Sequence, residues 1–375
     1  MFMLGHGHFA QFQNFQDCAP PEIASRSTWT GLQGFESGSQ LAKVRAIPHN
    51  MRWHLNSMWH AKQGLIGLPR GAAVFYTGDV QVDTLRLLHG YRKYYYIDLT
   101  SSLLRDMSPW YDHMRKSGSV ATAKDMGYRA TVQQFDGVFA MSRWTAAGVS
   151  RDYALPANRV HIALPGANLQ RWHYVDRSNR TGPVRILMVG GEFARKGGPL
   201  LLDWAANTTA RNWELDIVTW PGELPDWARA CIGNPGSFDS AAGSLGPRLP
   251  NVRVHCGLKA NDPQIMDLFR QADIFCLPTQ ADGSSIASLE AMATGLPVIV
   301  GAVGGIPELI EDGKTGLLLR PANAENLQTN LEALIADRPR RLQLGRAARE
   351  ACETYFNVER QIRDIMRVID SQAVH

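Results

Sequence analysis

The stretch Pro278–Glu308, PTQADGSSIASLEAMATGLPVIVGAVGGIPE, carries the strongest structural signals in this chain. The apolar run Asp273–Pro278 that leads into it predicts a strand. Ser284 or Ser285 can cap a helix that begins directly after them, and Gly295 stands where a glycine commonly follows a helix end. The pattern therefore predicts a strand, a polar loop and a buried helix that ends in a tight turn.

A second strand and a second helix start follow. Val298–Val300 predicts a short buried strand, and Gly304–Glu308 predicts a helix with proline in its first turn. Two helix N-termini at one sheet edge offer free backbone N–H groups to an anion such as a diphosphate. Because Asp282 and Glu290 flank the first of them, and carboxylates beside phosphate bind hydroxyl groups, the stretch predicts a sugar bound through a diphosphate.

The same stretch resembles the donor-site signature of family 4 glycosyltransferases. That signature is a Glu, seven residues and a second Glu, then Ala-Met-Ala-x-Gly-x-Pro-Val-Ile and a Gly-Gly-x-Pro-Glu loop. In this chain Asp282 replaces the first Glu, Ser284 the usual Phe and Ser285 the usual Gly. For any shorter part of the run, ordinary α/β packing with a solvated Glu290 is the alternative interpretation.

The resemblance implies a GT-B fold, in which two Rossmann-like α/β/α domains face each other across a cleft. It also implies a retaining transfer of a sugar from a nucleoside diphosphate to a hydroxyl acceptor, with cell-surface polysaccharide or glycoconjugate synthesis as the expected role. No metal or other cofactor is expected. The expected partners are a nucleotide-sugar and a carbohydrate or lipid-linked acceptor.

Individual roles on the donor side follow from the resemblance. Glu290 matches the Glu that accepts hydrogen bonds from the ribose, and Lys196 matches the Lys that meets the diphosphate. Asp282 matches the Glu that contacts the donor sugar, although its reach is shorter by about 1.5 Å. Residues 255–257 and 278–280 are expected to contact the base. The predicted donor-binding set is Gly191, Arg195, Lys196, Asp282, Gly283, Ser284, Ser285, Ile286, Glu290, Gly304 and Gly305.

One cation of the family pattern is missing. The Arg that usually follows the first Gly of this run is Gly191 here, and Arg195 is a candidate to supply the lost charge. A cation facing the diphosphate is needed because negative charge develops on the leaving group. An Arg-Lys-Gly turn at a helix start is otherwise often a solvated corner.

The acceptor side carries weaker signals. Asp98 follows an expected strand and is predicted to orient a hydroxyl group of the acceptor or of the donor sugar. A helix cap is an equally good interpretation of Asp98 and Thr100. The predicted acceptor-side set is Gly5, Gly7 and Thr100. The predicted catalytic set is Asp98, Asp282 and Lys196.

The 375 residues suggest two domains of ordinary size. The polar segment 171–182 suggests a break, giving an acceptor domain over 1–180, a donor domain over 181–355 and a C-terminal helix in 356–375 that packs back toward the first domain. The short run Met1–Leu4 suggests that part of the first strand is missing. Strands alternating with helical stretches predict parallel sheets that bind ligands beyond their carboxyl ends. The expected strands are 72–77, 93–98, 137–142, 184–190, 215–219, 252–255, 273–278 and 298–300.

Composition excludes several classes. Apolar residues make up 45% and no apolar run reaches the roughly 18 residues of a membrane span. No signal peptide is visible. The five cysteines show neither disulfide nor zinc spacing, which favours a reduced, cytoplasmic protein. Dispersed basic residues argue against nucleic-acid binding.

The net charge of +4 is unevenly distributed, with a basic excess before residue 180 and an acidic excess after it. The basic half suits an anionic membrane surface at the inner face of the membrane or a phosphorylated acceptor, and an ordinary mixed surface is the alternative. Two rival functions stay open. One is a nucleotide-sugar epimerase, and the other is a degenerate protein that binds nucleotide-sugars without turnover.

Overall fold

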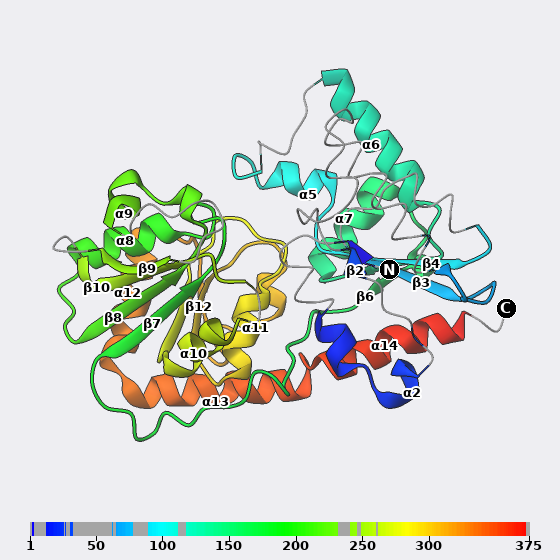
Figure 1. Ribbon diagram of the computed structural model, residues 1–375. Coiled ribbons are helices and arrows are strands. Elements are labelled where there is room, and N and C mark those ends of the chain that lie inside the picture. The colour runs from blue at the N-terminus through cyan, green and yellow to red at the C-terminus, as the bar shows by residue number, and fades with distance from the viewer. Residues whose placement is uncertain are drawn as a thin grey trace. The chain divides into compact units, whose positions relative to one another are not determined.

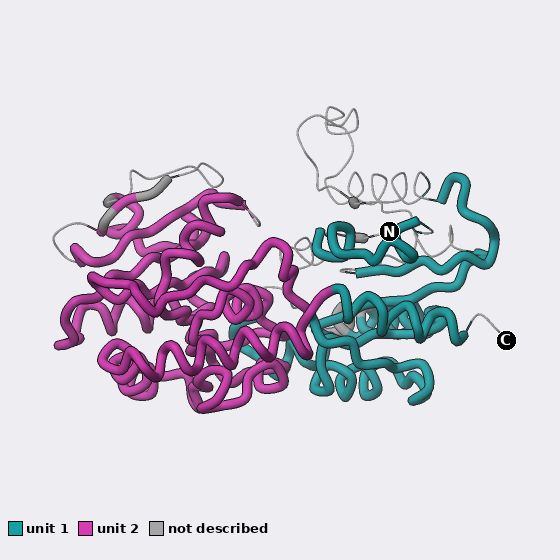
Figure 2. Tube along the Cα trace, turned by 90° about the horizontal axis from the view of Figure 1, so that it is seen from below, with its two compact units in different colours: residues 1–165, 359–375 teal, residues 166–358 magenta. Residues whose placement is uncertain are grey.

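The computed structural model describes residues 2–3, 13–25, 27, 31–32, 62, 65–77, 89–111, 118–231, 241–245, 249–259 and 262–372. The chain forms two compact units (Figure 2), one of residues 1–165 and 359–375 and the other of residues 166–358. Within the described residues, no helix is long and apolar enough to cross a membrane.

The second unit is built on a seven-stranded sheet with the order β13-β12-β11-β7-β8-β10-β9 (Figure 1). Among the strands that the structure describes in this sheet, β9 alone runs antiparallel to its neighbour. The strands are β7 (Val184–Val189), β8 (Trp213–Val218), β9 (Ala241–Leu245), β10 (Leu249–Cys256), β11 (Ile274–Leu277), β12 (Val298–Gly301) and β13 (Leu317–Leu319). The helices are α8 (Gly198–Asn207), α9 (Asp226–Cys231), α10 (Pro263–Gln271), α11 (Ile286–Ala293), α12 (Ala324–Ala336) and α13 (Arg338–Thr354).

Helices cover both faces of this sheet. Trp204 of α8 packs on Trp213 with ring centroids 4.7 Å apart, and Phe269 of α10 stacks on Phe275 at 5.7 Å. The strand register places Trp213 and Phe275 on opposite faces, so α8 and α10 lie on opposite sides. Both faces of β11 and β12 are buried, which explains their continuous apolar sequence.

The first unit contains a parallel sheet with the order β3-β4-β5-β6. Its strands are β3 (Ala73–Thr77), β4 (Arg92–Ile97), β5 (Gly137–Ala140) and β6 (Val160–Ile162), and β1 (Phe2–Met3) and β2 (Gly31–Leu32) form a separate pair. Its helices are 13–18, α2 (Pro21–Ala24), α5 (Ser101–Asp106), α6 (Gly118–Val132), α7 (Arg143–Tyr153) and α14 (Val358–Ser371), the last of which begins at the unit boundary.

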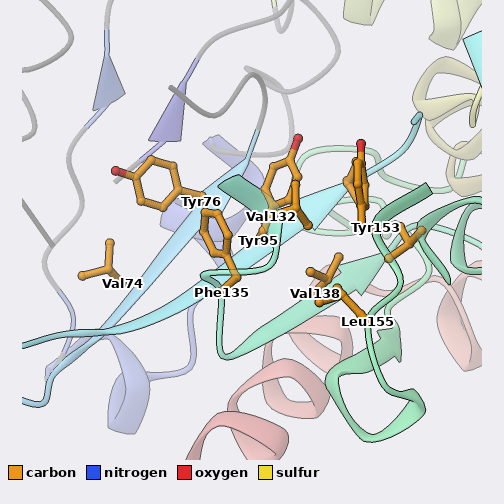
Figure 3. Packing of buried hydrophobic residues seen from close by; sticks show 10 residues of the cluster. Val74, Tyr76, Tyr95, Val132, Phe135, Val138, Tyr153 and Leu155 are labelled. Carbon is orange, nitrogen blue, oxygen red and sulfur yellow. The ribbon is translucent and has the colours of Figure 1, made fainter. Parts of the chain in front are cut away.

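Aromatic side chains pack on both faces of this smaller sheet, and Figure 3 shows the cluster on one of them. The ring of Phe135 lies 5.8 Å from that of Tyr76 and 5.4 Å from that of Tyr95. On α14, Gln361 donates a 2.6 Å hydrogen bond to the Tyr96 hydroxyl, and Arg92 donates to the carbonyl of Ile369. These bonds fix α14 to β4 within the first unit.

The segment 166–183 belongs to the second unit, so the unit boundary lies before the break expected near 180. Arg177 is buried, and its guanidinium donates to the carbonyls of Ala272, Val175, Thr294 and Phe269 at 2.7–3.0 Å. Three of these carbonyls lie at the C-terminal ends of α10 and α11. The polar composition that suggested a linker thus reflects side chains that bind helix ends.

The chain passes between the units twice, and the two passages are paired. The amide of Ala167 donates to the carbonyl of Phe356 at 2.8 Å, and the amide of Val358 donates to the carbonyl of Ala167 at 3.2 Å. Gly166 lies so close to Val358 that a Cβ would be 2.6 Å from its nitrogen. The two ends of the second unit therefore lie side by side.

The expected helix after Gly305 is wrong in extent. Only one 3-10 turn forms, Ile306–Glu308, and the chain then turns at Gly313 (φ +77°) and enters β13. The strands β6, β9 and β13 were not expected. Each is short and lies at the edge of its sheet.

Candidate functional site

The predicted donor residues lie at the carboxyl edge of the second unit's sheet. Gly190 and Gly191 follow β7, residues 278–285 follow β11, and residues 302–305 follow β12. These strands are parallel, so all three segments leave the sheet at the same edge. Ligands of open α/β sheets bind at such edges.

Lys196 and Asp282 form the central contact of this edge. The Lys196 Nζ lies 2.5 Å from Oδ2 of Asp282, and the carboxylate is 7% exposed. The pair joins the loop after β7 to the loop after β11. Two residues that the sequence placed at the diphosphate and at the donor sugar are thus brought into direct contact.

Arg195 supports the loop from inside. Its Nε and Nη2 donate to the two carboxylate oxygens of Glu192 at 2.7 and 2.8 Å, and its Nη1 donates to the carbonyl of Ala281 at 2.5 Å. Nη1 is also 3.8 Å from Oδ1 of Asp282. The guanidinium is buried and bound to Glu192, so most of its charge is balanced within the loop. Arg195 therefore positions Asp282 through its neighbour Ala281.

Two glycines let the loops approach closely. Gly197 has φ +83°, and a Cβ there would lie 2.1 Å from the carbonyl oxygen of Pro278. Gly304 has φ +55°, and a Cβ would lie 2.0 Å from the carbonyl oxygen of Asp282. A side chain at either position would push the loop after β11 away. The amide of Gly305 donates to the carbonyl of Gly283 at 2.9 Å and ties the two loops together.

The start of α11 confirms the predicted cap. The Ser285 hydroxyl accepts a hydrogen bond from the amide of Ser288 and lies 2.6 Å from its hydroxyl. Ile286 is the first helical residue, and Gly283 and Ser284 lead into the cap. The second helix N-terminus expected at this edge is absent, because residues 306–308 form only a 3-10 turn. The partial positive charge at this edge thus comes from the N-termini of α11 and of α8, which begins at Gly198.

Glu290 lies in the second turn of α11 and is 9% exposed. Burial raises the pKa of its carboxyl to about 8, and the positive charge of Arg171 opposes that shift. Within the described residues, no group donates a hydrogen bond to this carboxylate. Burial therefore favours the protonated form of this carboxyl, and a ligand that offers hydrogen-bond donors would favour the ionised form.

Gly191 is covered by an aromatic ring that the sequence analysis did not single out. A Cβ at Gly191 would lie 2.3 Å from Cε2 of Trp220, so the indole fills the space that any side chain at 191 would need. Trp220 follows β8 and is 36% exposed. The available signal was a Trp-Pro-Gly sequence directly after a predicted strand.

The acceptor-side residues lie in the first unit. Thr100 is the N-cap residue of α5, but its side chain makes no capping bond. The carboxylate of Asp152 caps this helix instead, accepting from the amide of Ser102 at 2.8 Å. The carbonyl of Asp98 accepts from the Thr145 hydroxyl at 2.7 Å. Gly5 and Gly7 lie outside the described residues.

Comparison with known proteins shows what the second unit is similar to. Residues 173–351 match the family model of the group 1 glycosyl transferases. The chain is 30% identical over 205 residues to the sulfoquinovosyl transferase SQD2 of Arabidopsis thaliana, a match that covers 54% of this chain and 38% of that protein. It is 27% identical over 275 residues to the alpha-maltose-1-phosphate synthase of Mycolicibacterium smegmatis, covering 69% and 68%.

The chain thus spans well under two thirds of the Arabidopsis enzyme. Among solved structures, the sucrose-phosphate synthase of Thermosynechococcus elongatus superposes with a TM-score of 0.68 at 19% identity, over 89% of this chain and 82% of that one. The fold is that of the GT-B glycosyltransferases. In the part of the chain that is described, no group of three or more His, Cys, Asp or Glu residues is placed to hold a metal ion.

Proposed function

We propose that this protein is a retaining glycosyltransferase that moves a sugar from a nucleoside diphosphate to a hydroxyl group. One observation carries the proposal: the Lys196–Asp282 pair lies at the sheet edge beside the start of α11, whose second turn holds the buried, unbonded Glu290 carboxyl. A cation, a helix N-terminus and two carboxylates are the groups that a nucleotide-sugar needs. The group 1 match over 173–351 supports the same assignment.

In this proposal the Lys196–Asp282 pair opens when the donor binds. The ammonium turns to the diphosphate, and the released carboxylate accepts hydrogen bonds from the sugar hydroxyls. Because each charged group exchanges one charged or polar partner for another, neither is left buried without compensation. Glu290 accepts from the ribose hydroxyls, and this bonding favours its ionised form.

The transfer breaks the bond between the anomeric carbon and the diphosphate oxygen. The acceptor oxygen forms its bond on the same face, and its proton passes to an oxygen of the departing diphosphate. Lys196 and the first turn of α11 stabilise the charge that develops on that leaving group. Asp98 keeps its predicted role of orienting a hydroxyl group.

The acceptor is proposed to be a carbohydrate or a lipid-linked carbohydrate in surface polysaccharide or glycoconjugate synthesis. The two relatives described above are named for a sulfoquinovosyl transfer and for maltose-1-phosphate synthesis. The basic excess before residue 180 supports contact with an anionic membrane surface. We also propose that transfer needs no metal, so that excess EDTA leaves the rate unchanged.

Thermal unfolding with a panel of nucleoside diphosphates and nucleotide-sugars tests the donor site, on the wild type and on Glu290→Ala. A ligand at 100 times its dissociation constant adds about 2.7 kcal/mol to stability and raises the Tm by several degrees. We expect one base class to stabilise the wild type and not the variant. The active donor is then supplied with acceptor sugars, and the anomeric configuration of the product is read by NMR. An inverted product contradicts retention.

Binding without turnover is the second candidate. It is favoured by the ion pairs of the two cationic side chains at this edge, because Lys196 is paired with Asp282 and Arg195 is paired with Glu192. Nucleotide-sugar binding with no release of nucleoside diphosphate, across acceptors that include lipid-linked sugars, favours this candidate over transfer.

A further inference from the structure

We propose that Trp220 is the platform on which the nucleobase of the donor stacks. The inference rests on the proposed donor site and names a residue that determines its specificity. It follows from the position of the indole, from its fixed backbone and from the chemistry of the groups on either side.

The backbone of Trp220 is held on both sides. The amide of Trp220 donates to the carbonyl of Gly191 at 3.2 Å, and the Thr219 hydroxyl donates to the same carbonyl at 3.0 Å. The amide of Thr219 donates to the carbonyl of His255 at the end of β10, at 3.1 Å. Pro221 then begins a 3-10 turn that fixes the exit of the chain.

The indole is both supported and accessible. Its Cε2, Cζ2 and Nε1 atoms lie against the backbone of Gly191, where an added Cβ would approach within 2.3–2.7 Å. The residue as a whole is 36% exposed. A ring that rests on backbone and has open surface is preorganised for stacking, because little conformational entropy remains to be lost.

Trp220 lies along the sheet edge where the nucleoside end of a nucleotide-sugar is expected. Asp282 follows β11, and Lys196 follows the neighbouring strand β7, with its side chain against Gly190. Trp220 follows β8, the next strand in the order. A donor that places its sugar at Asp282 and its diphosphate at Lys196 therefore extends its nucleoside toward Trp220.

Among the parts of the donor, the base is the one that the chemistry of an indole ring suits. An indole face offers no charge to a phosphate, and it stacks well on a flat aromatic ring. The base is the aromatic part of a nucleotide-sugar, and stacking on an aromatic side chain contributes about 1–3 kcal/mol per base. Removing the ring is expected to weaken nucleotide binding about tenfold.

Isothermal calorimetry on the full chain tests the assignment with two probes, the nucleoside diphosphate that stabilises the wild type and inorganic pyrophosphate. We expect Trp220→Ala to bind the nucleotide about tenfold more weakly and pyrophosphate as the wild type does, whereas Trp220→Phe retains most of the affinity. Tyr355→Ala is the matched control, because Tyr355 is also an exposed aromatic residue and follows α13, outside the predicted donor set. It should bind both probes like the wild type.

A second variant tests the contact with Gly191 without removing the indole. In Gly191→Ala the new methyl group displaces the ring, so nucleotide affinity should fall as in Trp220→Ala. In the double variant Gly191→Ala/Trp220→Ala no further loss is expected, because the ring is already gone. The Tm of each variant is measured alongside to separate binding from folding.

Three outcomes overturn the proposal. Equal nucleotide affinity of Trp220→Ala and the wild type refutes it and leaves the donor site standing. If Trp220→Ala weakens pyrophosphate binding as much as nucleotide binding, the ring does not act on the base and the base assignment is wrong. A wild type that binds no nucleotide at all removes both this inference and the proposed function.

Discussion

Replacing Glu290 with glutamine is expected to stabilise the ligand-free protein at alkaline pH. The wild-type carboxyl has its pKa raised from 4.5 to about 8 by burial, so the folded state holds a proton that the unfolded state has lost. A raised folded-state pKa means that stability falls as pH rises between these two values. Glutamine has nearly the same shape and does not titrate.

The size of this stabilisation follows from the difference between the pKa of Glu290 in the unfolded state and in the folded state. Each pH unit between 4.5 and about 8 lowers the wild-type free energy of unfolding by about 1.4 kcal/mol, and the total is about 5 kcal/mol. The two proteins should therefore be about equally stable at pH 4.5, and Glu290→Gln should be more stable by about 3 kcal/mol at pH 7 and by about 5 kcal/mol at pH 9.

Urea unfolding at pH 5, 6, 7, 8 and 9 measures the difference between the two proteins, which cancels the titration of every other group. Glu350→Gln is the control, because Glu350 is an exposed carboxyl on α13 and its replacement should leave the pH profile unchanged. Parallel profiles for the wild type and Glu290→Gln would refute the reasoning. The same variant should bind nucleotides about tenfold or more weakly, since it loses a charge-assisted hydrogen-bond acceptor.

Three further substitutions test the loops and their support. Lys196→Met should weaken the binding of nucleoside diphosphate and of pyrophosphate at least about tenfold in calorimetry. The substitution also leaves the buried Asp282 carboxylate without its partner at 2.5 Å. Unchanged pyrophosphate affinity would show that Lys196 does not bind the diphosphate. Gly197→Ala should cost about 2–4 kcal/mol in urea unfolding, because its φ is +83° and the methyl group would meet a backbone carbonyl at 2.1 Å, whereas Gly222→Ala has open space and should cost little. Arg177→Met should cost about 3 kcal/mol or more by removing four hydrogen bonds to backbone carbonyls, although those of Ala272 and Thr294 keep a second donor. A Tm within a degree of the wild type would contradict that account.

The helix after β11 was predictable because its signals are local. Ser285 caps the helix with its own side chain, and Gly295 adopts φ +79° just past the end. Both features depend on residues within one helical turn of the helix end, and few other residue types can take either place. The turn at Ile306–Glu308 shows the limit of such signals, since a start signal carries no information about length.

The contacts of the site were less predictable because they join distant segments. The sequence placed Lys196 and Asp282 in one site from a family resemblance, but it gave no reason for their direct pairing. From the sequence, Arg195 was a candidate to bind the diphosphate. In the structure it pairs with Glu192, and this pairing depends on how the loop folds back on itself. The ring of Trp220 over Gly191 depends on the alignment of two neighbouring strands.

The pairing of Ala167 with Phe356 and Val358 has a topological consequence. The second unit is in effect an insertion within the first, with both of its ends at one place. Chain segments with adjacent ends can be removed or exchanged with little strain on what remains. Residues 166–358 are therefore the piece to excise or to graft into another protein of the same fold, whereas a cut at 181 would remove Arg177 and strip donors from the ends of α10 and α11.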